Sequence, residues 1–583
     1  MADPLADDSR SSEPAEEEIS AQKSITEAPE TEIQGIEKDA ELGRIDREIQ
    51  SGHTADANAA KVSAVVEDFM KLATEANEAN ESERNMTLRD AFKIYPKAVG
   101  WSVVASSSLI MAAYGTTIIG EAQVFPAFRN KLGNELLSGS WQKGVSAGAN
   151  VGQILGLQIA AIMSERLGYR WTIISASLAT VASVFIPVFA ESLPVFVAGQ
   201  ILLFILWGAF QLVTVAYAAE VCPVPLRHYL AVFVFLCWVV GQLIASGVLV
   251  AFEWMQDDWG YRAPIALQWV WPVPIAIGMY LAPESPWWCV RKGHKDQAQK
   301  SLKRLTRNFS QHEICTAIAL MTYINETEKQ VTKGTAYWDC LKGTNLKRTE
   351  NVCIVWLAYA LSGAAIGGHG AILYQQAGIS FQTIYDLSLG VTVLATITTI
   401  MVWLLLDRVG RKTTLFGGMC LILIILLTVG TLLLVITATA NTIKPVVLAI
   451  VSEIPSIRLR AKSIALARSV YIIADTIFVS IVIDRQLSSK EWNWGLKSGF
   501  FWAGINALLT TYIYFRLPET KGRTYAELSI LFINKVPARK FISTKIGLLM
   551  GSTENTPREL AIRLANTVAL EAQTRGIILN VVS

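Results

Sequence analysis

The composition of the 583-residue chain is that of a membrane protein. Hydrophobic residues make up 52% of the chain and charged residues 17%, and the mean hydropathy is +0.37. This composition excludes an ordinary soluble protein, and a net charge of +2 gives no reason to expect a nucleic-acid partner. The seven cysteines lack a metal-binding spacing. We therefore expect no metal site.

The N-terminal part of the chain, residues 1–95, is an acidic tail. Fifteen of its first fifty residues are Asp or Glu, whereas five are Lys or Arg. The tail is also poor in aromatic residues, so it cannot bury enough apolar surface to fold by itself. We predict that residues 1–95 are disordered and cytosolic.

Long apolar stretches follow the tail. A membrane-spanning helix needs about 20 mostly apolar residues, and we predict eleven such helices. Their expected ranges are 99–126, 141–163, 171–190, 194–219, 229–252, 264–282, 352–375, 386–406, 413–437, 463–484 and 497–517. We assign the first six to an N-terminal bundle (96–282) and the others to a C-terminal bundle (352–517).

A polar central loop, residues 283–351, separates the two predicted bundles. It contains seven Lys or Arg between Arg291 and Arg307. Loops rich in Lys and Arg stay on the cytosolic side of a membrane. We therefore predict that this loop, both termini and the C-terminal tail (518–583) are cytosolic.

Three charged motifs occur in the same order in both halves. The pairs are ERLGYR (165–170) with DRVGRK (407–412), EVCPVPLR (220–227) with EIPSIRLR (453–460), and PESPWW (283–288) with PETKGR (518–523). An ordered triple indicates a duplicated transporter, whose acid–base pairs bridge helices in one state and release them in another. The candidate gate residues are Glu165, Arg166, Arg170, Glu220, Arg227, Glu284, Asp407, Arg408, Arg411, Glu453, Arg460, Glu519 and Arg523.

The second half is shorter than the first between corresponding motifs. Glu165 and Glu220 are 55 residues apart, whereas Asp407 and Glu453 are 46 apart. Because basic motifs flank both ends of the second segment, an even number of crossings must lie between them. We predict that residues 438–452 supply a shortened or broken tenth helix that begins near Pro445, where the proline ring removes a backbone donor.

Several longer stretches resemble the major facilitator superfamily, in its sugar-porter branch, and in particular the fungal α-glucoside (maltose-type) permeases. They include ANVGQILGL (149–157), YAAEVCPVPLR (217–227), the segment 261–293 and FRLPETKGRTYAEL (515–528). The resemblance implies an all-α fold of two six-helix bundles around a cavity that opens alternately to either membrane face. It also implies a monomer in the cell membrane that imports α-glucosides such as maltose together with protons, without a cofactor or catalytic residues.

The resemblance further implies which side chains face the sugar, and several differ from the family pattern. Two amide positions of helix seven are Tyr359 and Ala360 here, and an Asn position of helix five is Phe235. Apolar side chains cannot hydrogen-bond to sugar hydroxyls, so we expect weak affinity for maltose. The cavity candidates carried over from the family are Gln200, Phe235, Gln242, Tyr359, His369, Gln375, Leu448, Tyr471 and Ile472.

The second difference from the family pattern concerns proton coupling. Gly115 stands where sugar porters carry an Asp in helix one, which leaves Asp475, Arg468 and Glu121 as candidates for coupling. Arg468 and Asp475 are seven residues apart and share a helix face with Tyr471. An intramembrane carboxylate can carry a proton, but an Arg468–Asp475 ion pair that only steadies the helix explains the same residues. Glu121 can also lie at the headgroup level.

Three other interpretations fit the sequence. The apolar substitutions favour a divergent facilitator for another small metabolite, including an exporter. The long acidic tail allows a sugar sensor. The short segment 438–452 allows a truncated, non-functional permease.

Overall fold

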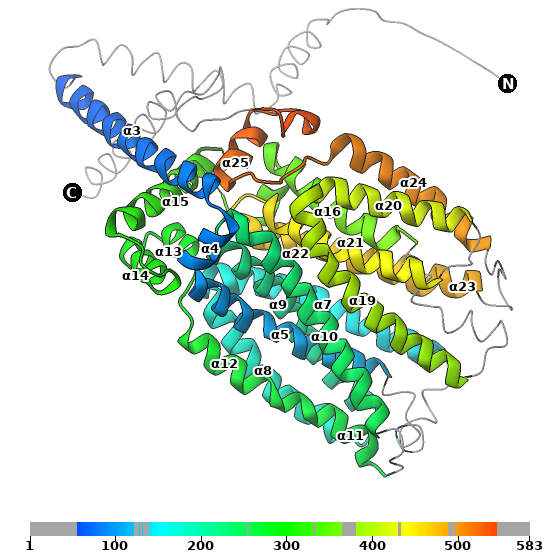
Figure 1. The fold of residues 1–583 in the computed structure, drawn as a ribbon. Helices are drawn as coiled ribbons and strands as arrows, with labels where there is room; N and C mark the ends of the chain where they lie inside the picture. Colours follow the sequence, from blue (N-terminus) through cyan, green and yellow to red (C-terminus); the bar gives the residue numbers. More distant parts are fainter. Residues whose placement is uncertain are drawn as a thin grey trace, which may run out of the picture. The chain divides into compact units, whose positions relative to one another are not determined.

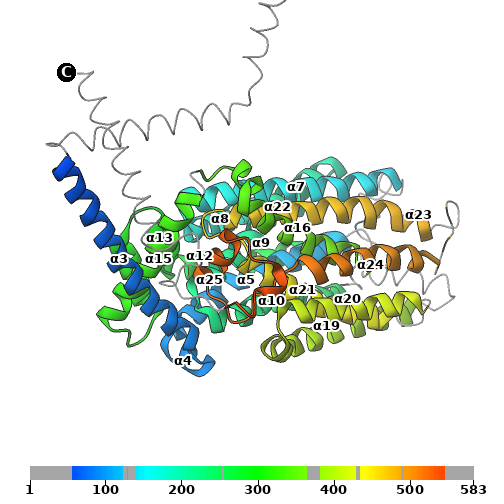
Figure 2. The same cartoon turned by 90° about the horizontal axis from the view of Figure 1, so that it is seen from above.

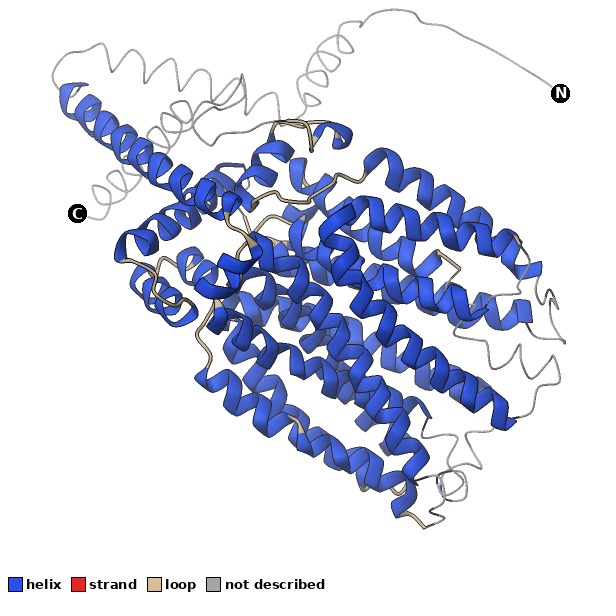
Figure 3. Ribbon diagram, in the orientation of Figure 1, coloured by secondary structure: helices blue, strands red, loops and turns tan. Residues whose placement is uncertain are grey.

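The computed structural model is helical throughout its described elements. The described residues are 55–121, 128, 131, 139–252, 255, 257–331, 334–363, 381–428, 433–487, 492, 494 and 497–544. Within these ranges no strand is formed (Figure 3). The all-α prediction is therefore confirmed.

The chain divides into two units. The smaller unit consists of Met1–Met70 and Arg558–Ser583. It is described only over residues 55–70, which form the first part of helix α3 (Ala55–Asn85). The larger unit, Lys71–Pro557, contains every other described element.

Six successive helical segments build the first half of the larger unit (Figure 1). They are α5 (Pro96–Glu121), α7 (Gly139–Leu167), α8 (Tyr169–Val188), α9 (Leu193–Val221), α10 (Val224–Phe252), and the interrupted segment α11 (Trp259–Ala266), η2 (Leu267–Val270) and α12 (Pro272–Leu281). Each of the six is long and apolar enough to cross a membrane. The boundary between α7 and α8 falls at Gly168, whose φ of +90° suits glycine alone.

The second half repeats this layout. Its helices are α16 (Gly343–Leu361), α19 (Phe381–Val409), α20 (Arg411–Leu427), α21 (Leu433–Glu453), α22 (Arg460–Ala474) with its continuation η4 (Asp475–Ile483) and α23 (Asp484–Leu487), and α24 (Ser498–Arg516). Gly410, with φ +100°, separates α19 from α20 as Gly168 separates α7 from α8. Among the described segments of this half, α22 together with η4 is long and apolar enough to cross a membrane.

The two halves meet along two seams. Helix α7 of the first half packs against α22 of the second, and the two lie side by side in Figure 2. Helix α10 packs against α19 and α21. These seams bring residues from opposite halves to a common central axis.

Helices outside the two bundles, most of them short, gather at one end of the bundles, which we call the gate end (Figure 1). They are α4 (Leu88–Ile94), α13 (Pro286–Arg291), α14 (Lys295–Leu305), α15 (Gln311–Val331), η3 (Tyr337–Leu341), α25 (Tyr525–Ile533) and η6 (Ala538–Lys540). The charged motifs of both halves lie at this same end, because each motif directly follows or precedes a helix that ends here.

The predicted disorder of residues 1–95 is wrong for its second part. Helix α3 extends to Asn85, and α4 follows it directly. In α3, the side chains of Ala73, Ala76 and Asn80 are buried, at helical spacing. Small side chains let this helix pack closely without the aromatic residues that the tail lacks. Residues 1–54 lie outside the described part of the chain.

The tenth helix also differs from the prediction. Helix α21 begins at Leu433 rather than near Pro445 and runs unbroken for 21 residues with this proline inside it. Its length of about 31 Å is enough to cross a 30 Å hydrocarbon core. The apolar pattern assigns residues 433–437 to the ninth helix, whereas α20 already ends at Leu427. With 21 residues, α21 is nevertheless shorter than its 29-residue counterpart α9, as expected.

Candidate functional site

A cavity of about 40 Å³ lies between the two halves. Helices α5, α7, α9 and α10 line it from one half, and α16, α21 and α22 line it from the other. Its lining residues are Leu109, Leu157, Gln211, Val215, Val234, Phe235, Trp238, Trp356, Lys444, Leu448, Ile464 and Arg468. A mainly apolar and aromatic wall with a few polar groups is typical of a small-molecule site.

Arg468 joins the two halves across the cavity. Its guanidinium carbon lies 4.3 Å from the ring centroids of both Trp356 and Tyr471. Its Nε donates a hydrogen bond to Oε1 of Gln211, 3.2 Å away on α9 of the other half. Its Nη1 is buried and has no hydrogen-bond partner among the described residues. This arrangement leaves one strong donor available for a ligand.

Lys444 enters the same cavity from α21. Its ammonium lies 5.1 Å from the ring centroid of Phe235, 5.3 Å from Trp238 and 5.6 Å from Tyr359. A desolvated cation–π contact contributes about 2 kcal/mol, whereas a Lys at the centre of a membrane helix costs about 2.5–3.5 kcal/mol on insertion scales. The rings therefore offset much of the cost of the charge. Within the described part of the chain, no hydrogen bond or ion pair satisfies this ammonium.

A carboxylate completes the charged group. The hydroxyl of Tyr471 donates a hydrogen bond to Asp475, and the Tyr471 ring stacks on Tyr359 with centroids 5.8 Å apart. Asp475 is the first residue of η4, a π-helix. Such helices are rare and are frequently found at functional sites.

At the gate end, two glutamates hold the first half together. Glu284 accepts hydrogen bonds from the backbone N–H groups of Tyr169, Arg170 and Ser285, at 2.9–3.1 Å. Burial raises the pKa of Glu284 to about 7, although these backbone donors favour its charged form.

Glu220 is the second glutamate of this cluster. It accepts hydrogen bonds from the Tyr169 hydroxyl at 2.9 Å and the Ser285 hydroxyl at 2.6 Å. Arg291 donates to both of its carboxylate oxygens, at 2.9 and 3.3 Å. The carboxylate thus ties α9 to α8 and α13.

The second half repeats the arrangement. Glu519 accepts hydrogen bonds from the backbone N–H groups of Arg411 and Lys412, at 3.0 and 2.9 Å. Glu453 accepts from Nη2 of Arg411, at 3.2 Å, and from the Thr520 hydroxyl. The duplication seen in the sequence is therefore also a duplication of hydrogen bonds.

Three contacts close the gate end across the two halves. Nη1 of Arg460 lies 3.6 Å from Oε1 of Glu220, and both side chains are fully buried. Nζ of Lys462 lies 2.6 Å from Oε2 of Glu165. Nη1 of Arg291 donates to the carbonyl of Ile457, at 3.3 Å. The cavity is therefore closed from this end in the present structure.

Comparison with known proteins identifies the family. Residues 101–532 match the family described as "Sugar (and other) transporter". The chain is 38% identical to a maltose permease of Saccharomyces cerevisiae over 547 residues, which cover 89% of this chain and 88% of that permease. It is 37% identical to a general alpha-glucoside permease of the same yeast, with 82% of each chain covered. The chain belongs to the sugar transporter family.

The fold of the transporter is also that of a solved structure. XylE, a proton:xylose symporter of the major facilitator superfamily bound to 6-bromo-6-deoxy-D-glucose, matches with a TM-score of 0.66 at 20% identity. The match covers 75% of this chain and 99% of XylE. This match confirms the major facilitator fold. The family match and the seven described helices that are long and apolar enough to cross a membrane confirm a multi-pass membrane protein.

Only some of the predicted cavity residues lie at the cavity. Phe235 and Leu448 line the cavity, and Tyr359 and Tyr471 stand beside it, stacked on each other. Gln200 and Gln242 are not among its lining residues, and Ile472 is buried in the core. His369 and Gln375 lie outside the described residues, and Glu121 ends α5 with a side chain that is not described.

Gly115 is explained by a neighbouring indole. A Cβ at this position would lie 2.2 Å from Cζ2 of Trp207 and 2.9 Å from Oε1 of Gln268. Trp207 itself is fully buried. Its ring therefore occupies the space that a larger side chain at position 115 would need, so Trp207 would have to move to admit a carboxylate there.

Four polar or aromatic residues of the cavity wall were not singled out from the sequence: Gln211, Trp238, Trp356 and Lys444. Lys444 carries the clearest signal, because an ionisable residue within a membrane helix is a functional candidate by default. Its significance was obscured by the predicted start of the tenth helix near Pro445, which placed it at a membrane boundary instead of mid-helix.

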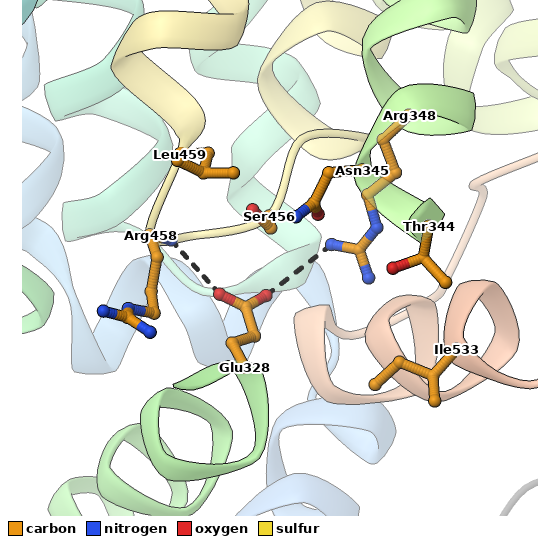
Figure 4. A pocket seen from close by; sticks show the side chains of 8 residues that line it. All are labelled: Glu328, Thr344, Asn345, Arg348, Ser456, Arg458, Leu459 and Ile533. Atoms are coloured by element: carbon orange, nitrogen blue, oxygen red, sulfur yellow. Dashed lines mark hydrogen bonds and ion pairs between the residues drawn. The ribbon is translucent and has the colours of Figure 1, made fainter. Parts of the chain in front are cut away.

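A further junction joins the central loop to the second half (Figure 4). Glu328 of α15 accepts a hydrogen bond from the backbone N–H of Arg458, at 3.1 Å, and lies 3.6 Å from Nη1 of Arg348. It also accepts from the Ser529 hydroxyl, at 3.0 Å. One carboxylate thus connects α15 to α16, α25 and the start of α22.

Helix α3 bridges the two halves at the same end. Glu83 pairs with Arg227 of the first half at 3.2 Å. Arg84 pairs with Glu527 of α25 at 3.3 Å, and the Thr524 hydroxyl donates to Asn80 at 2.6 Å. The final turns of α3 therefore act as a strap across the gate end.

The remaining gate candidates have lesser or different roles. Arg166 and Arg408 are exposed. Arg170 donates to the carbonyl of Tyr280. Arg523 donates to the carbonyl of Phe541 at 2.7 Å, within the second half. The side chain of Asp407 is not described.

Proposed function

We propose that this transporter imports α-glucosides together with protons across the cell membrane, as a monomer with both termini in the cytosol. The basic central loop supports a cytosolic gate end through the positive-inside rule. The permease relatives, which are named for maltose and alpha-glucosides, support the substrate class. XylE, named a proton:xylose symporter, shares the fold.

The observation that carries the proposal is a cavity built from both halves above a closed gate. Alternating access requires such a shared cavity, because rocking of the halves then exposes it to one face at a time. The aromatic rings of Trp356 and Tyr359 offer faces for sugar rings. Gln211 and Arg468 offer hydrogen-bonding groups for hydroxyls. The present volume of about 40 Å³ admits only water-sized molecules, so substrate enters in a more open state.

Opening of the gate end must break the pairs that cross the halves. Arg460 leaves Glu220 and Lys462 leaves Glu165 when the halves separate there. Water entering the opened end then solvates both charges, which lowers the cost of separating them. Sugar binding has to favour one of the two states to shift the population.

Asp475 is the carboxylate best placed for proton coupling. It borders the cavity through Tyr471 and interacts electrostatically with Arg468 and Lys444. Protonation of Asp475 would remove its attraction for both cations and so change the charge at the seam between the halves. A proton can thereby bias the same two-state movement as the substrate.

Uptake by yeast that lacks its own α-glucoside permeases tests the proposal. We expect saturable uptake of radiolabelled maltose, with half-saturation above the micromolar range, that a protonophore abolishes. Asp475→Asn should lose accumulation while retaining substrate exchange, whereas Asp258→Asn, which removes a surface carboxylate, should retain both. Absence of saturable uptake at normal surface expression would overturn the substrate class, and accumulation by Asp475→Asn would overturn the role of this carboxylate.

A second function is favoured by one observation. The cavity wall is largely apolar, with Phe235 and Leu448 among its lining residues, which suits a metabolite with fewer hydroxyls than maltose. Export of such a metabolite would appear as substrate loss from loaded cells. The truncated-permease interpretation loses its basis, because α21 is long enough to cross the membrane.

A further inference from the structure

The charges around the cavity do not balance. Lys444 and Arg468 are two cations that line it, and they repel each other. Asp475 is the carboxylate that interacts with both, and it also accepts the Tyr471 hydrogen bond. When Lys444 and Arg468 are both protonated, one positive charge at the cavity is left without a compensating anion among the described residues.

The aromatic rings around Lys444 stabilise its ammonium charge without neutralising it. Its three neighbouring rings come from both sides of the seam: Phe235 and Trp238 on α10, and Tyr359 on α16. Ring faces attract a cation through their quadrupole but supply no negative ion. A ligand that enters the cavity therefore meets an ammonium that is oriented and still able to pair.

The second cation points to the same chemistry. Arg468 uses its Nε for Gln211, and its buried Nη1 has no described hydrogen-bond acceptor. A planar carboxylate matches a guanidinium and an ammonium as donors, and charge-assisted hydrogen bonds are about twice as strong as neutral ones. The donor geometry and the charge both suit an anionic group.

We infer that the glycoside taken by this site carries a carboxylate, as in an acidic α-glucoside whose second sugar unit is an aldonic or uronic acid. This inference rests on the proposed function for the sugar part of the ligand. The carboxylate pairs with Lys444 and with Nη1 of Arg468, and the glucose ring packs against the aromatic wall. One uncompensated positive charge matches a monoanion, which favours a carboxylate over a phosphate dianion.

The inference also accounts for the lost amide positions of helix seven. Tyr359 stands at one of them. Its ring lies against the ammonium of Lys444 and also stacks on Tyr471. The side chain thus supports a cation instead of hydrogen-bonding a neutral sugar. A neutral disaccharide would leave the ammonium unpaired, which is unfavourable in a water-poor cavity.

Binding to the purified full chain in lipid nanodiscs tests the inference. Maltobionate and maltitol are a matched pair, because both carry α-linked glucose on an open chain and differ by a carboxylate in place of a hydroxymethyl group. With radiolabelled ligands in equilibrium dialysis, we expect maltobionate to bind at least tenfold more tightly than maltitol. Lys444→Met should reduce this ratio to near one, and Lys444→Arg should restore most of it.

Lys497→Met is the matched control, since it removes one exposed lysine at the start of α24, away from the cavity. It should keep the wild-type ratio. A monodisperse elution profile is required of each variant, and Lys444→Gln replaces Lys444→Met if the latter aggregates. Glucose 1-phosphate forms a separate arm, and tighter binding of it than of maltobionate would overturn the assignment to a carboxylate.

The outcomes separate the two proposals. Equal binding of maltobionate and maltitol would overturn the inference and leave α-glucoside transport intact. A preference for maltobionate that persists in Lys444→Met would also overturn the assigned role of this lysine. If the wild-type chain binds neither ligand and also fails to bind maltose, the proposed function itself is wrong.

Discussion

The gate ends of the two halves use the same backbone plan with different side chains. In both, a carboxylate accepts hydrogen bonds from the first turn of a helix that follows a glycine with positive φ. The second carboxylate of each half, Glu220 or Glu453, has different ion-pair partners in the two halves. Glu453 pairs with Arg411 within its own half, whereas Glu220 depends on Arg291 and on Arg460 of the other half.

This difference assigns distinct roles to equivalent positions. Tyr169 stands where Arg411 stands in the second half, and its hydroxyl donates to Glu220 as the Arg411 guanidinium donates to Glu453. A neutral donor leaves the charge of Glu220 available to a cation from elsewhere. The first half thus supplies the charge that locks the gate, and the second half keeps its own charge internally balanced.

Removal of the Glu220 charge should have the largest effect. Glu220→Gln leaves Arg291 and the fully buried Arg460 without their anion, and breaking a buried pair costs about 3–5 kcal/mol. We expect a large loss of thermal stability and faster labelling of a cysteine placed at the gate end from the cytosolic side. Glu453→Gln is the matched variant and should destabilise the protein without faster labelling. Equal labelling of the two variants would contradict the asymmetry.

Replacement of the two glycines at the helix boundaries, Gly168 and Gly410, should destabilise the protein to different extents. Gly168→Ala places a methyl group 2.3 Å from Oε2 of Glu284 in a left-handed conformation, whereas the equivalent distance from Gly410 to Glu519 is 2.8 Å. Backbone strain of this kind costs about 1–3 kcal/mol, so both variants should melt at lower temperature and Gly168→Ala should lose more. Thermal denaturation followed by size-exclusion chromatography measures the ranking, and a more stable Gly168→Ala would refute it.

The stability of the first half should depend on pH through Glu284. The pKa of Glu284 is raised from 4.5 in the unfolded chain to about 7 by burial, so its protonated form stabilises the folded state. This contribution is complete below about pH 4.5 and is lost as the pH rises through about 7. Wild-type stability should therefore fall, relative to Glu284→Gln, between pH 5 and pH 8. Parallel stability curves for the two proteins over this range would disprove the assignment.

The smallest effect is expected for Tyr169→Phe. The change removes one hydrogen bond from a neutral donor to the charged Glu220 carboxylate, which Arg291 and Ser285 still hold. A loss of about 1.5 kcal/mol is expected, at the lower end for a hydrogen bond to a charged group. Arg411→Met, at the equivalent position, removes the cation that balances Glu453 and should cost more. Chemical denaturation of the two variants compares them, and a larger loss for Tyr169→Phe would argue against distinct roles.

The sequence by itself determined the fold and the order of the gate motifs. Long apolar stretches predict several of the spans within a few residues, because crossing a membrane requires a set length of apolar helix. The range predicted as 194–219 is helix α9 at Leu193–Val221, and the range predicted as 497–517 is α24 at Ser498–Arg516. The repeated spacing of charged residues likewise predicts where Glu220 and Glu453 belong.

Only the tertiary structure decided where helices divide within apolar sequence and which side chains meet at the centre. The boundary between α20 and α21 lies within one stretch that the sequence analysis assigns to a single helix, and the packing of α3 depends on small residues against the folded bundle. The cavity joins residues such as Gln211 and Arg468, which are 257 positions apart. Local patterns record burial and helical period, whereas an aromatic cage around Lys444 arises only when helices from both halves pack together.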